Sequence, residues 1–321
     1  METCRERMEL RGTILDGRYR VGPTIGTGGT GVCMEAERLA TLERVVIKML
    51  RPNFAGTPDL ASRLRREYEV AHRVFHPGIV PVIDQGTLHD GSPYIVMKYM
   101  GSESLNSFLR RCGVLSCEQL AVIVARVCSI LHSVHRRGYV HRDVKPEHVL
   151  LNRGAHGELE VHLLDFGVCA AETAPTAEKS RERGRVYGTP SYSSPEQASG
   201  NPYVDARADL FGLGVLMYEA LSGRLPFPGS DVNAILRRII SEDAPRVSLF
   251  VPQLDPDMDA LIAKLMSRHR DARYTSARAL TRALAPWLQD RMQTERRLAA
   301  MLDVIQDTAN RRPSSRQALV A

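Results

Sequence analysis

Near the middle of the chain, apolar residues recur at helical spacing on a segment with almost no polar face. They are Leu120, Ile123, Val124, Val127, Leu131 and Val134. A surface helix keeps one polar side toward water, whereas a helix that is apolar nearly all round is buried. We therefore expect this helix in a core, with other elements on every side. A chain of 321 residues with 43% hydrophobic content is large enough to build one.

The chain changes character at Gly101. Before it, short β-prone runs broken by glycines cover residues 19–49, and strands return over residues 79–100. A charged helix is expected between these stretches, over roughly residues 60–75. After Gly101, helical patterns dominate, with two short strands among them. The sequence therefore predicts an α+β fold of two lobes, a small N-terminal lobe of β-sheet plus one helix and a larger, mostly helical C-terminal lobe.

Charge and cysteine content argue against several classes of protein. The formal net charge of +6 is spread along the chain, without the dense basic tract that would follow a nucleic acid. The six cysteines form no CxxC pair and no Cys/His cluster at zinc spacing. The longest apolar run, residues 120–125, is far shorter than the roughly 20 residues of a membrane span. Because the N-terminus also lacks a signal-peptide core, we expect a cytoplasmic protein with no membrane span and no nucleic acid partner.

A glycine-rich stretch follows the first β-prone run. Gly26, Gly28 and Gly31 have GxGxxG spacing directly after Ile25. The same spacing occurs in dinucleotide-binding loops, in mobile hairpins and in loops that close over phosphates. A dinucleotide loop opens a helix, however, and here residues 32–36 lead into another strand. A hairpin over phosphates fits better, because the missing side chains let backbone N–H groups approach the oxygens.

Lys48 ends the strand-like run Val45-Val46-Ile47-Lys48 and is the only lysine among the first 97 residues. One interpretation is a surface lysine at a strand end. The other is a lysine directed at phosphates, which needs a carboxylate to hold it in place. Glu67, on the following helix, is the candidate partner.

Two motifs that each contain an aspartate, called the acidic motifs below, lie in the second part of the chain. His141-Arg142-Asp143-Val144-Lys145-Pro146 is followed, 22 residues after Asp143, by Asp165-Phe166-Gly167. Further motifs are Gly188-Thr189-Pro190, Ser194-Pro195-Glu196 and Asp271-Ala272-Arg273-Tyr274. In this order and spacing they resemble the eukaryotic-like protein kinases. The glycine loop and residues 191–198 look most like the bacterial Hanks-type Ser/Thr members of that family.

The resemblance implies a protein kinase domain over residues 19–284. Its N-lobe would cover about residues 19–98 and its C-lobe about residues 101–284. Residues 1–18 would form an N-terminal extension. Residues 285–321 would form a C-terminal helix and a polar tail, which we interpret as a charged linker following the domain.

The resemblance also implies a role for each matching residue. Asp143 would accept or orient the proton of the substrate hydroxyl, and Lys145 would neutralise the γ-phosphate during transfer. Asp165 would hold Mg²⁺ against the phosphates of ATP. The implied ATP site consists of a glycine-loop roof, a lysine–glutamate pair, a gatekeeper and a hinge, formed by Ile25, Gly26, Gly28, Gly31, Cys33, Lys48, Glu67, Met97 and Met100.

Regulatory and substrate-binding positions follow from the same resemblance. Arg142 would meet a phosphate on the activation segment, where the candidate phosphosites are Thr173, Thr176 and Ser180. Thr189 would shape the substrate pocket. Glu196 would form an ion pair with Arg273. We expect protein substrates, and autophosphorylation of the activation segment between two copies of a homodimer.

One position departs from the family pattern in a way that bears on the chemistry. His148 occupies the place of an asparagine that holds the second metal ion and braces the catalytic loop. An imidazole binds borderline metals such as Mn²⁺ but is a poor ligand for Mg²⁺, and it lacks the bracing amide. We expect reduced activity, a shift toward Mn²⁺, or no activity. Lesser departures are Cys33, where valine is usual over the adenine, and Lys98, where an acidic hinge residue is common.

Three functions are therefore open. The first is a protein Ser/Thr kinase that uses ATP and Mg²⁺ or Mn²⁺. The second is a pseudokinase scaffold that binds nucleotide, because of His148. The third is a small-molecule kinase with similar lobes, such as an antibiotic phosphotransferase, although these lack a protein-docking segment like residues 167–196. The presence of Lys48, Glu67, Asp143, Lys145 and Asp165 together favours the first function.

Overall fold

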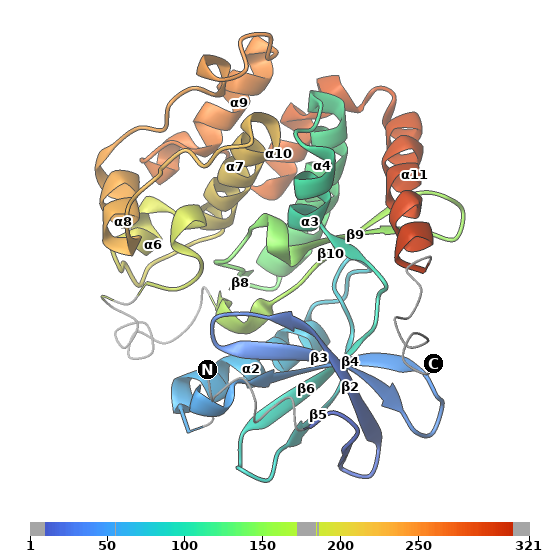
Figure 1. The fold of residues 1–321 in the computed structure, drawn as a ribbon. Helices are drawn as coiled ribbons and strands as arrows, with labels where there is room; N and C mark the ends of the chain where they lie inside the picture. Colours follow the sequence, from blue (N-terminus) through green and yellow to red (C-terminus); the bar gives the residue numbers. More distant parts are fainter. Residues whose placement is uncertain (1–9, 55, 172–183, 185, 311–321) are drawn as a thin grey trace, which may run out of the picture.

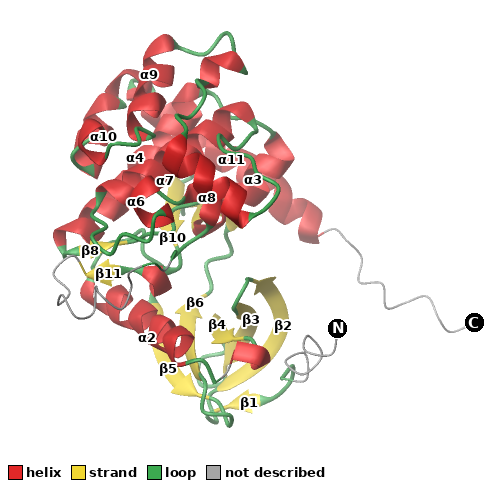
Figure 2. Cartoon of the chain, turned by 90° about the vertical axis from the view of Figure 1, so that its left-hand side faces the viewer, coloured by secondary structure: helices red, strands yellow, loops and turns green. Residues whose placement is uncertain are grey.

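A computed structural model describes residues 10–54, 56–171, 184 and 186–310. The chain folds into two lobes, a sheet lobe at the bottom of Figure 1 and a helical lobe above it. Figure 2 shows the same division, with most strands gathered in one lobe and most helices in the other. The predicted two-lobed α+β architecture is confirmed.

The N-lobe is an antiparallel sheet with one long helix against it. The strand order is β1-β2-β3-β4-β6-β5. The helix, α2 (Pro58–Arg73), turns Leu64, Glu67 and Val70 inward, and its neighbours in the sheet include β4, β5 and β6. The strands are β1 (Ile14–Leu15), β2 (Tyr19–Thr27), β3 (Gly31–Arg38), β4 (Arg44–Leu50), β5 (Val82–Thr87) and β6 (Pro93–Lys98).

The C-lobe is built around two buried helices, α4 (Cys117–Arg136) and α7 (Arg207–Ser222). Thirteen of the sixteen residues of α7 are buried. The surrounding helices are α3 (Leu105–Cys112), α6 (Pro195–Ala198), α8 (Val232–Ser241), α9 (Pro256–Leu265), α10 (Ala277–Ala283) and α11 (Arg291–Asn310). The predicted apolar core helix is therefore confirmed as α4.

Helix α4 begins at a capping box. The Ser116 hydroxyl accepts a hydrogen bond from the Gln119 N–H, and the Gln119 side chain accepts one from the Ser116 N–H. Within the described part of the chain, α4 is the one helix that is long and apolar enough to cross a membrane. Most of it is buried inside the structure. Its composition is that of a core helix.

Short strands at the top of the C-lobe carry the residues of interest. The hairpin of β9 (Val149–Arg153) and β10 (Leu159–Leu163) pairs with β7 (Glu103–Ser104). The strands β8 (Tyr139–Val140) and β11 (Ala170–Ala171) form a separate pair. Because β9 starts directly after His148 and β10 ends just before Asp165, the hairpin brings these two residues to the side that faces the N-lobe.

The end of the chain is more closely joined to the C-lobe than the sequence suggested. The expected C-terminal helix is present as α11, but it packs against α4 and the β9–β10 hairpin, beside which it stands in Figure 1. Leu298 and Leu302 are buried in the main core, and Glu295 accepts hydrogen bonds from Arg126 of α4. The interpretation of this segment as a linker is wrong for residues 291–302. Residues 311–321, the predicted polar tail, lie outside the described part.

Candidate active site

The position of Lys48 follows from the alternation of β4. Val45, Ile47 and Met49 point to one side of the sheet, where they are buried in the N-lobe core. Lys48 therefore points to the other side, toward α2. Its Nζ donates to Glu67 Oε2 at 2.7 Å and lies 3.1 Å from Asp165 Oδ1. The interpretation of Lys48 as an isolated surface lysine is excluded, and its predicted pairing with Glu67 is confirmed.

The backbone around the hairpin fixes the relation between His148 and Asp165. The Leu164 N–H donates to the His148 carbonyl at 2.9 Å. Asp165 itself has a left-handed backbone, with φ of 65°, which is uncommon for a non-glycine residue and typical of functional sites. Phe166 packs edge-on against His141, at 5.0 Å between ring centres. The two acidic motifs are therefore held together by both backbone and ring contacts.

The catalytic-loop residues predicted from the first motif form one cluster. Lys145 Nζ lies 3.0 Å from Asp143 Oδ2 and donates to Thr189 Oγ1 at 2.5 Å. The Thr189 N–H donates to Asp143 Oδ1 at 2.7 Å. Asp143 thus has each carboxylate oxygen directed by a different donor, and the predicted meeting of Thr189 with Asp143 and Lys145 is confirmed.

Asp209, at the start of α7, fixes the backbone of the loop that carries His141 and Arg142. Its buried carboxylate accepts from the backbone N–H groups of His141 at 2.9 Å and Arg142 at 2.7 Å. It is also 2.7 Å from His135 Nε2. Arg142 has φ of 68°, another strained non-glycine conformation, and these hydrogen bonds help to maintain it.

His148 lies between the two acidic motifs. Its Nδ1 donates to the Asp143 carbonyl oxygen at 2.9 Å, and its Nε2 is 3.5 Å from Asp165 Oδ2. The amide that braces the loop in the family pattern is absent, as expected, but the loop is still held by a side chain at this position. The ring makes the bracing hydrogen bond in place of an amide, because Nδ1 can reach the loop backbone while Nε2 stays directed at Asp165.

Opposite charges set the ionisation of these groups. Burial alone would lower the pKa of Lys48, but Asp165 and Glu67 raise it well above its usual value. Burial likewise opposes ionisation of Asp143, yet His148 and Lys145 lower its pKa. Burial lowers the pKa of His148 in spite of the nearby carboxylates of Asp165 and Asp143, which act in the opposite direction. Burial raises the pKa of Glu67 to about 7, although Lys48 acts in the opposite direction. The site thus combines a fixed ammonium with the ionised carboxylates of Asp143 and Asp165.

The predicted roof of the ATP site is a β-hairpin. Strands β2 and β3 pair antiparallel, with Gly26 opposite Cys33, and the Gly28 N–H donates to the Gly31 carbonyl. No helix follows the glycines, so the dinucleotide-loop alternative is wrong. Cys33 is the strand partner of Lys48 and faces the same side of the sheet. The exposed Ile25, on β2, lies at the outer part of this roof.

The predicted hinge connects β6 to the C-lobe. Met97 is buried beside Leu64 and Ile95, as a gatekeeper between the sheet and α2 would be. Met100 packs partly against the same cluster, which Leu150 of β9 also joins. The space where the lobes meet is therefore bordered by the β2–β3 hairpin and by three further residues, Lys48, Met97 and Leu150.

On either side of Thr189, the chain lies against the backbone carbonyl of Arg142. The side chain of Gln197 donates to the Arg142 carbonyl at 2.8 Å. Gly188 has φ of 94°, and a Cβ there would lie 2.6 Å from the same carbonyl oxygen, so only glycine fits. We did not predict the role of Gln197. Its signal was the spacing Ser194-x-x-Gln197, a capping box that begins α6.

The predicted pair of Glu196 and Arg273 is present and buried. Arg273 donates two hydrogen bonds to the carboxylate, at 2.8 and 2.9 Å, and its side chain has no exposed surface. This bidentate contact joins the end of the activation segment to the distal part of the C-lobe. Thr173, Thr176 and Ser180 lie outside the described residues, so the regulatory role of Arg142 stays a prediction.

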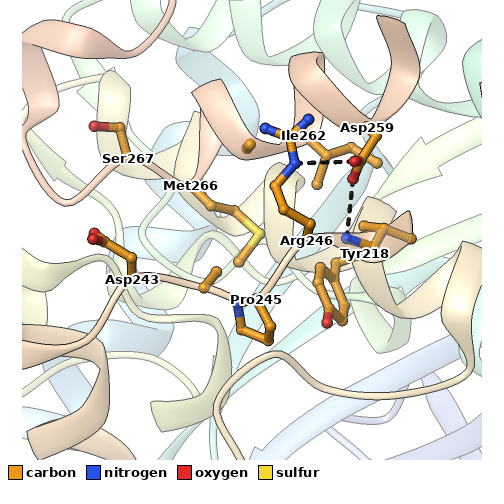
Figure 3. Close-up of a pocket in the computed structure, with 11 residues that line it drawn as sticks. Tyr218, Asp243, Pro245, Arg246, Asp259, Ile262, Met266 and Ser267 are labelled. Carbon is orange, nitrogen blue, oxygen red and sulfur yellow. Dashed lines mark hydrogen bonds and ion pairs between the residues drawn. The ribbon is translucent and has the colours of Figure 1, made fainter. Parts of the chain in front are cut away.

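A separate pocket lies between α7, α9 and the loop at residues 243–247 (Figure 3). Its charged side chains are engaged with the protein, because Asp259 accepts from Arg246 at 2.9 Å and from Val247 and Ser248. It contains none of the residues described above. The pocket therefore has no part in the candidate active site.

Comparison with known proteins decides the family. A model described as the protein kinase domain matches residues 19–287. The chain belongs to the protein kinase family. The predicted resemblance is thus confirmed over nearly the range expected.

Several relatives with similar sequences are bacterial kinases. The chain is 36% identical to a probable serine/threonine-protein kinase of Streptomyces coelicolor, over 82% of its own length and 39% of that protein. It is 34% identical to the serine/threonine-protein kinase PknB of Mycolicibacterium smegmatis, over 82% of this chain and 42% of PknB. For the serine/threonine-protein kinase Pkn3 of Myxococcus xanthus the identity is 32%, over 84% and 50%. The chain spans about 40% of the length of the first two relatives.

Proposed function

We propose that this chain transfers the γ-phosphate of ATP to serine or threonine hydroxyls of proteins. The observation that carries the proposal is one contiguous set of contacts across the lobes, from Glu67 through Lys48 to Asp165, and from His148 through Asp143 and Lys145 to Thr189. Phosphoryl transfer needs little covalent chemistry from the protein. It needs charges that are held in fixed positions, and this set provides them.

The nucleotide would lie under the β2–β3 hairpin. Lys48, oriented by Glu67, is placed to bind the α- and β-phosphates. Lys48 is paired with Oδ1 of Asp165, whereas Oδ2 faces His148. Asp165 and His148 are therefore the residues that would hold a divalent cation. Such an ion neutralises developing charge on the phosphate oxygens. Among the described residues no group of three or more His, Cys, Asp or Glu side chains forms a metal site, which fits an ion that takes its other ligands from ATP and water.

The acceptor hydroxyl would lie beside Asp143. Because the pKa of Asp143 is lowered, its carboxylate is ionised and can accept the proton of the hydroxyl or orient it. Lys145, held by Asp143 and Thr189, supplies a positive charge near the transferred group. The Thr189 contacts also fix the floor against which an acceptor side chain would rest.

Protein acceptors are favoured over small molecules by the anchored segment that follows Asp165. The Glu196–Arg273 pair and the Gln197–Arg142 contact hold a docking surface next to the catalytic loop. The names of the relatives support serine/threonine specificity and lend no support to the pseudokinase alternative. We infer a cytoplasmic kinase that phosphorylates its own activation segment between two copies of the chain, at sites such as Thr173, Thr176 and Ser180.

A phosphotransfer assay tests the proposal. The chain would be incubated with labelled ATP and casein, in Mg²⁺ and separately in Mn²⁺, with the phosphorylated residues identified by mass spectrometry. We expect phosphoserine and phosphothreonine, and no transfer by D165A. We expect H148N to raise the rate in Mg²⁺. The absence of transfer in both metals, with nucleotide still bound, would leave a scaffold role.

A further inference from the structure

The ring of His148 touches the catalytic loop on one side and faces the DFG aspartate, Asp165, on the other. Nδ1 lies 2.9 Å from the carbonyl oxygen of Asp143. Nε2 lies 3.5 Å from Oδ2 of Asp165. The side chain is only 12% exposed, so the ring has little freedom to turn away.

The Asp143 contact determines which nitrogen carries the hydrogen. A carbonyl oxygen only accepts hydrogen bonds, so Nδ1 must be the donor. Nε2 is then the ring nitrogen left facing Asp165, 3.5 Å from its Oδ2, while Lys48 is engaged with the other oxygen, Oδ1. An imidazole nitrogen and a carboxylate oxygen directed at one point are arranged like two ligands of a single cation.

We propose that Nε2 of His148 is a direct ligand of the divalent cation that accompanies ATP, and that this nitrogen makes the site prefer a borderline cation such as Mn²⁺ over Mg²⁺. The proposal rests on the proposed ATP-dependent function and specifies its metal. Mg²⁺ prefers oxygen ligands, whereas imidazole nitrogen suits transition metals. The Asp143 carbonyl orients the ring in the way that outer hydrogen-bond partners orient metal-binding histidines.

The separation of the two donor atoms agrees with this assignment. Ligand atoms about 2.1 Å from an octahedral ion lie about 3 Å apart when they are adjacent. The observed 3.5 Å is close to this value, so a small movement of either side chain would let both bind one ion. Asp165, with a side chain 34% exposed, is the one with room to move.

Pulsed electron paramagnetic resonance of bound Mn²⁺ tests the ligation without measuring turnover. The full chain would be loaded with Mn²⁺ and the β,γ-methylene analogue of ATP, which has no bridging nitrogen that could add a signal. We expect nitrogen modulation from a directly bound imidazole, with the pattern changed by ¹⁵N-histidine labelling. H148N should lose that modulation. The matched control is H156N, the same substitution at an exposed histidine of the β9–β10 hairpin, which should retain it.

Metal preference gives a second readout. Titration of the chain and nucleotide analogue with each metal should yield a Mn²⁺ to Mg²⁺ affinity ratio that falls about tenfold in H148N and is unchanged in H156N. Absence of imidazole modulation from bound Mn²⁺, or an unchanged affinity ratio in H148N, would overturn the proposal. A chain that shows the modulation but transfers no phosphate would refute the proposed function and leave the ligand assignment standing.

Discussion

The ammonium of Lys48, on the N-lobe sheet, lies 3.1 Å from the carboxylate of Asp165, on the C-lobe. The two residues are far apart in the sequence, and their contact closes the cleft in which ATP would bind. Glu67 holds the ammonium from the other side at 2.7 Å. Substitution of Lys48 alone therefore tests whether this contact between the lobes matters for activity.

We predict that K48M lowers the rate of phosphotransfer at least about 10²-fold, the usual scale for loss of one fixed charge at a reacting group. The thioether keeps the length of the side chain, so the fold should persist. Steady-state kinetics measure the rate, and circular dichroism checks the fold. R44M, on the same strand but with a half-exposed side chain, is the matched control and should retain most of the activity. Full activity in K48M would contradict the assignment.

Cys33 should react slowly at neutral pH. Burial raises the pKa of its thiol to about 11, although Lys48 acts in the opposite direction. The thiolate is the reactive form, so its alkylation should rise about tenfold per pH unit between pH 7.5 and 9.5. Mass spectrometry of the Cys33 peptide after iodoacetamide treatment measures the rate. A short unstructured peptide with one cysteine, whose thiol pKa is near the ordinary value of about 8.5, should level off within that range. A plateau for Cys33 below pH 9 would contradict the raised pKa of its thiol.

Asp209 should contribute to stability in a pH-dependent way. Burial would raise its pKa, but His135, through a hydrogen bond and its charge, lowers it below the ordinary value. The ionised carboxylate therefore stabilises the fold above about pH 4 and ceases to do so as the pH falls through its folded-state pKa. We expect D209N to lower the free energy of unfolding by about 3 kcal/mol at pH 7, with a smaller difference below pH 4. Urea unfolding at several pH values measures this, with D257N at an exposed aspartate as control. A pH-independent difference would argue against an ionised Asp209.

The buried pair of Arg273 and Glu196 should be costly to break. R273A leaves a buried carboxylate without its partner, so we expect a loss of about 3–5 kcal/mol in the free energy of unfolding. The control is R268A, whose partner Asp243 is 78% exposed, and where we expect at most about 1 kcal/mol. Urea denaturation compares the two variants. Equal losses in the free energy of unfolding for the two variants would mean that the burial of Arg273 does not strengthen its ion pair.

Helix α11 should behave as part of the domain. Leu298 is fully buried, whereas Met292 on the same helix is 68% exposed. L298A should therefore lower the free energy of unfolding by about 2–5 kcal/mol, while M292A should change it by less than about 0.5 kcal/mol. Thermal or urea unfolding distinguishes them. A single transition for L298A that matches the unaltered chain would restore the linker interpretation.

Sequence patterns predicted most of the fold because its elements are strongly periodic. The β-prone run that ends at Lys48 is strand β4, and the apolar α4 could only be central. The apolar residues of α11 have irregular spacing, and its burial depends on packing against α4 and the β9–β10 hairpin, which no local pattern reveals. The orientation of the His148 ring was equally hidden, because the carbonyl of Asp143 that selects its hydrogen-bonding nitrogen is a matter of loop geometry.

Helix α7 touches two loops with different tasks. At one end Asp209 holds the backbone of the catalytic loop, and near the other Glu219 accepts a hydrogen bond from Tyr192, beside the surface where an acceptor protein would dock. The turns between them are almost entirely enclosed by apolar neighbours. A shift of this helix would move the loop that carries Asp143 and the proposed docking surface together. Evolution of new acceptor preferences is therefore expected to proceed through the surface loops, while the helix itself stays under joint constraint from both.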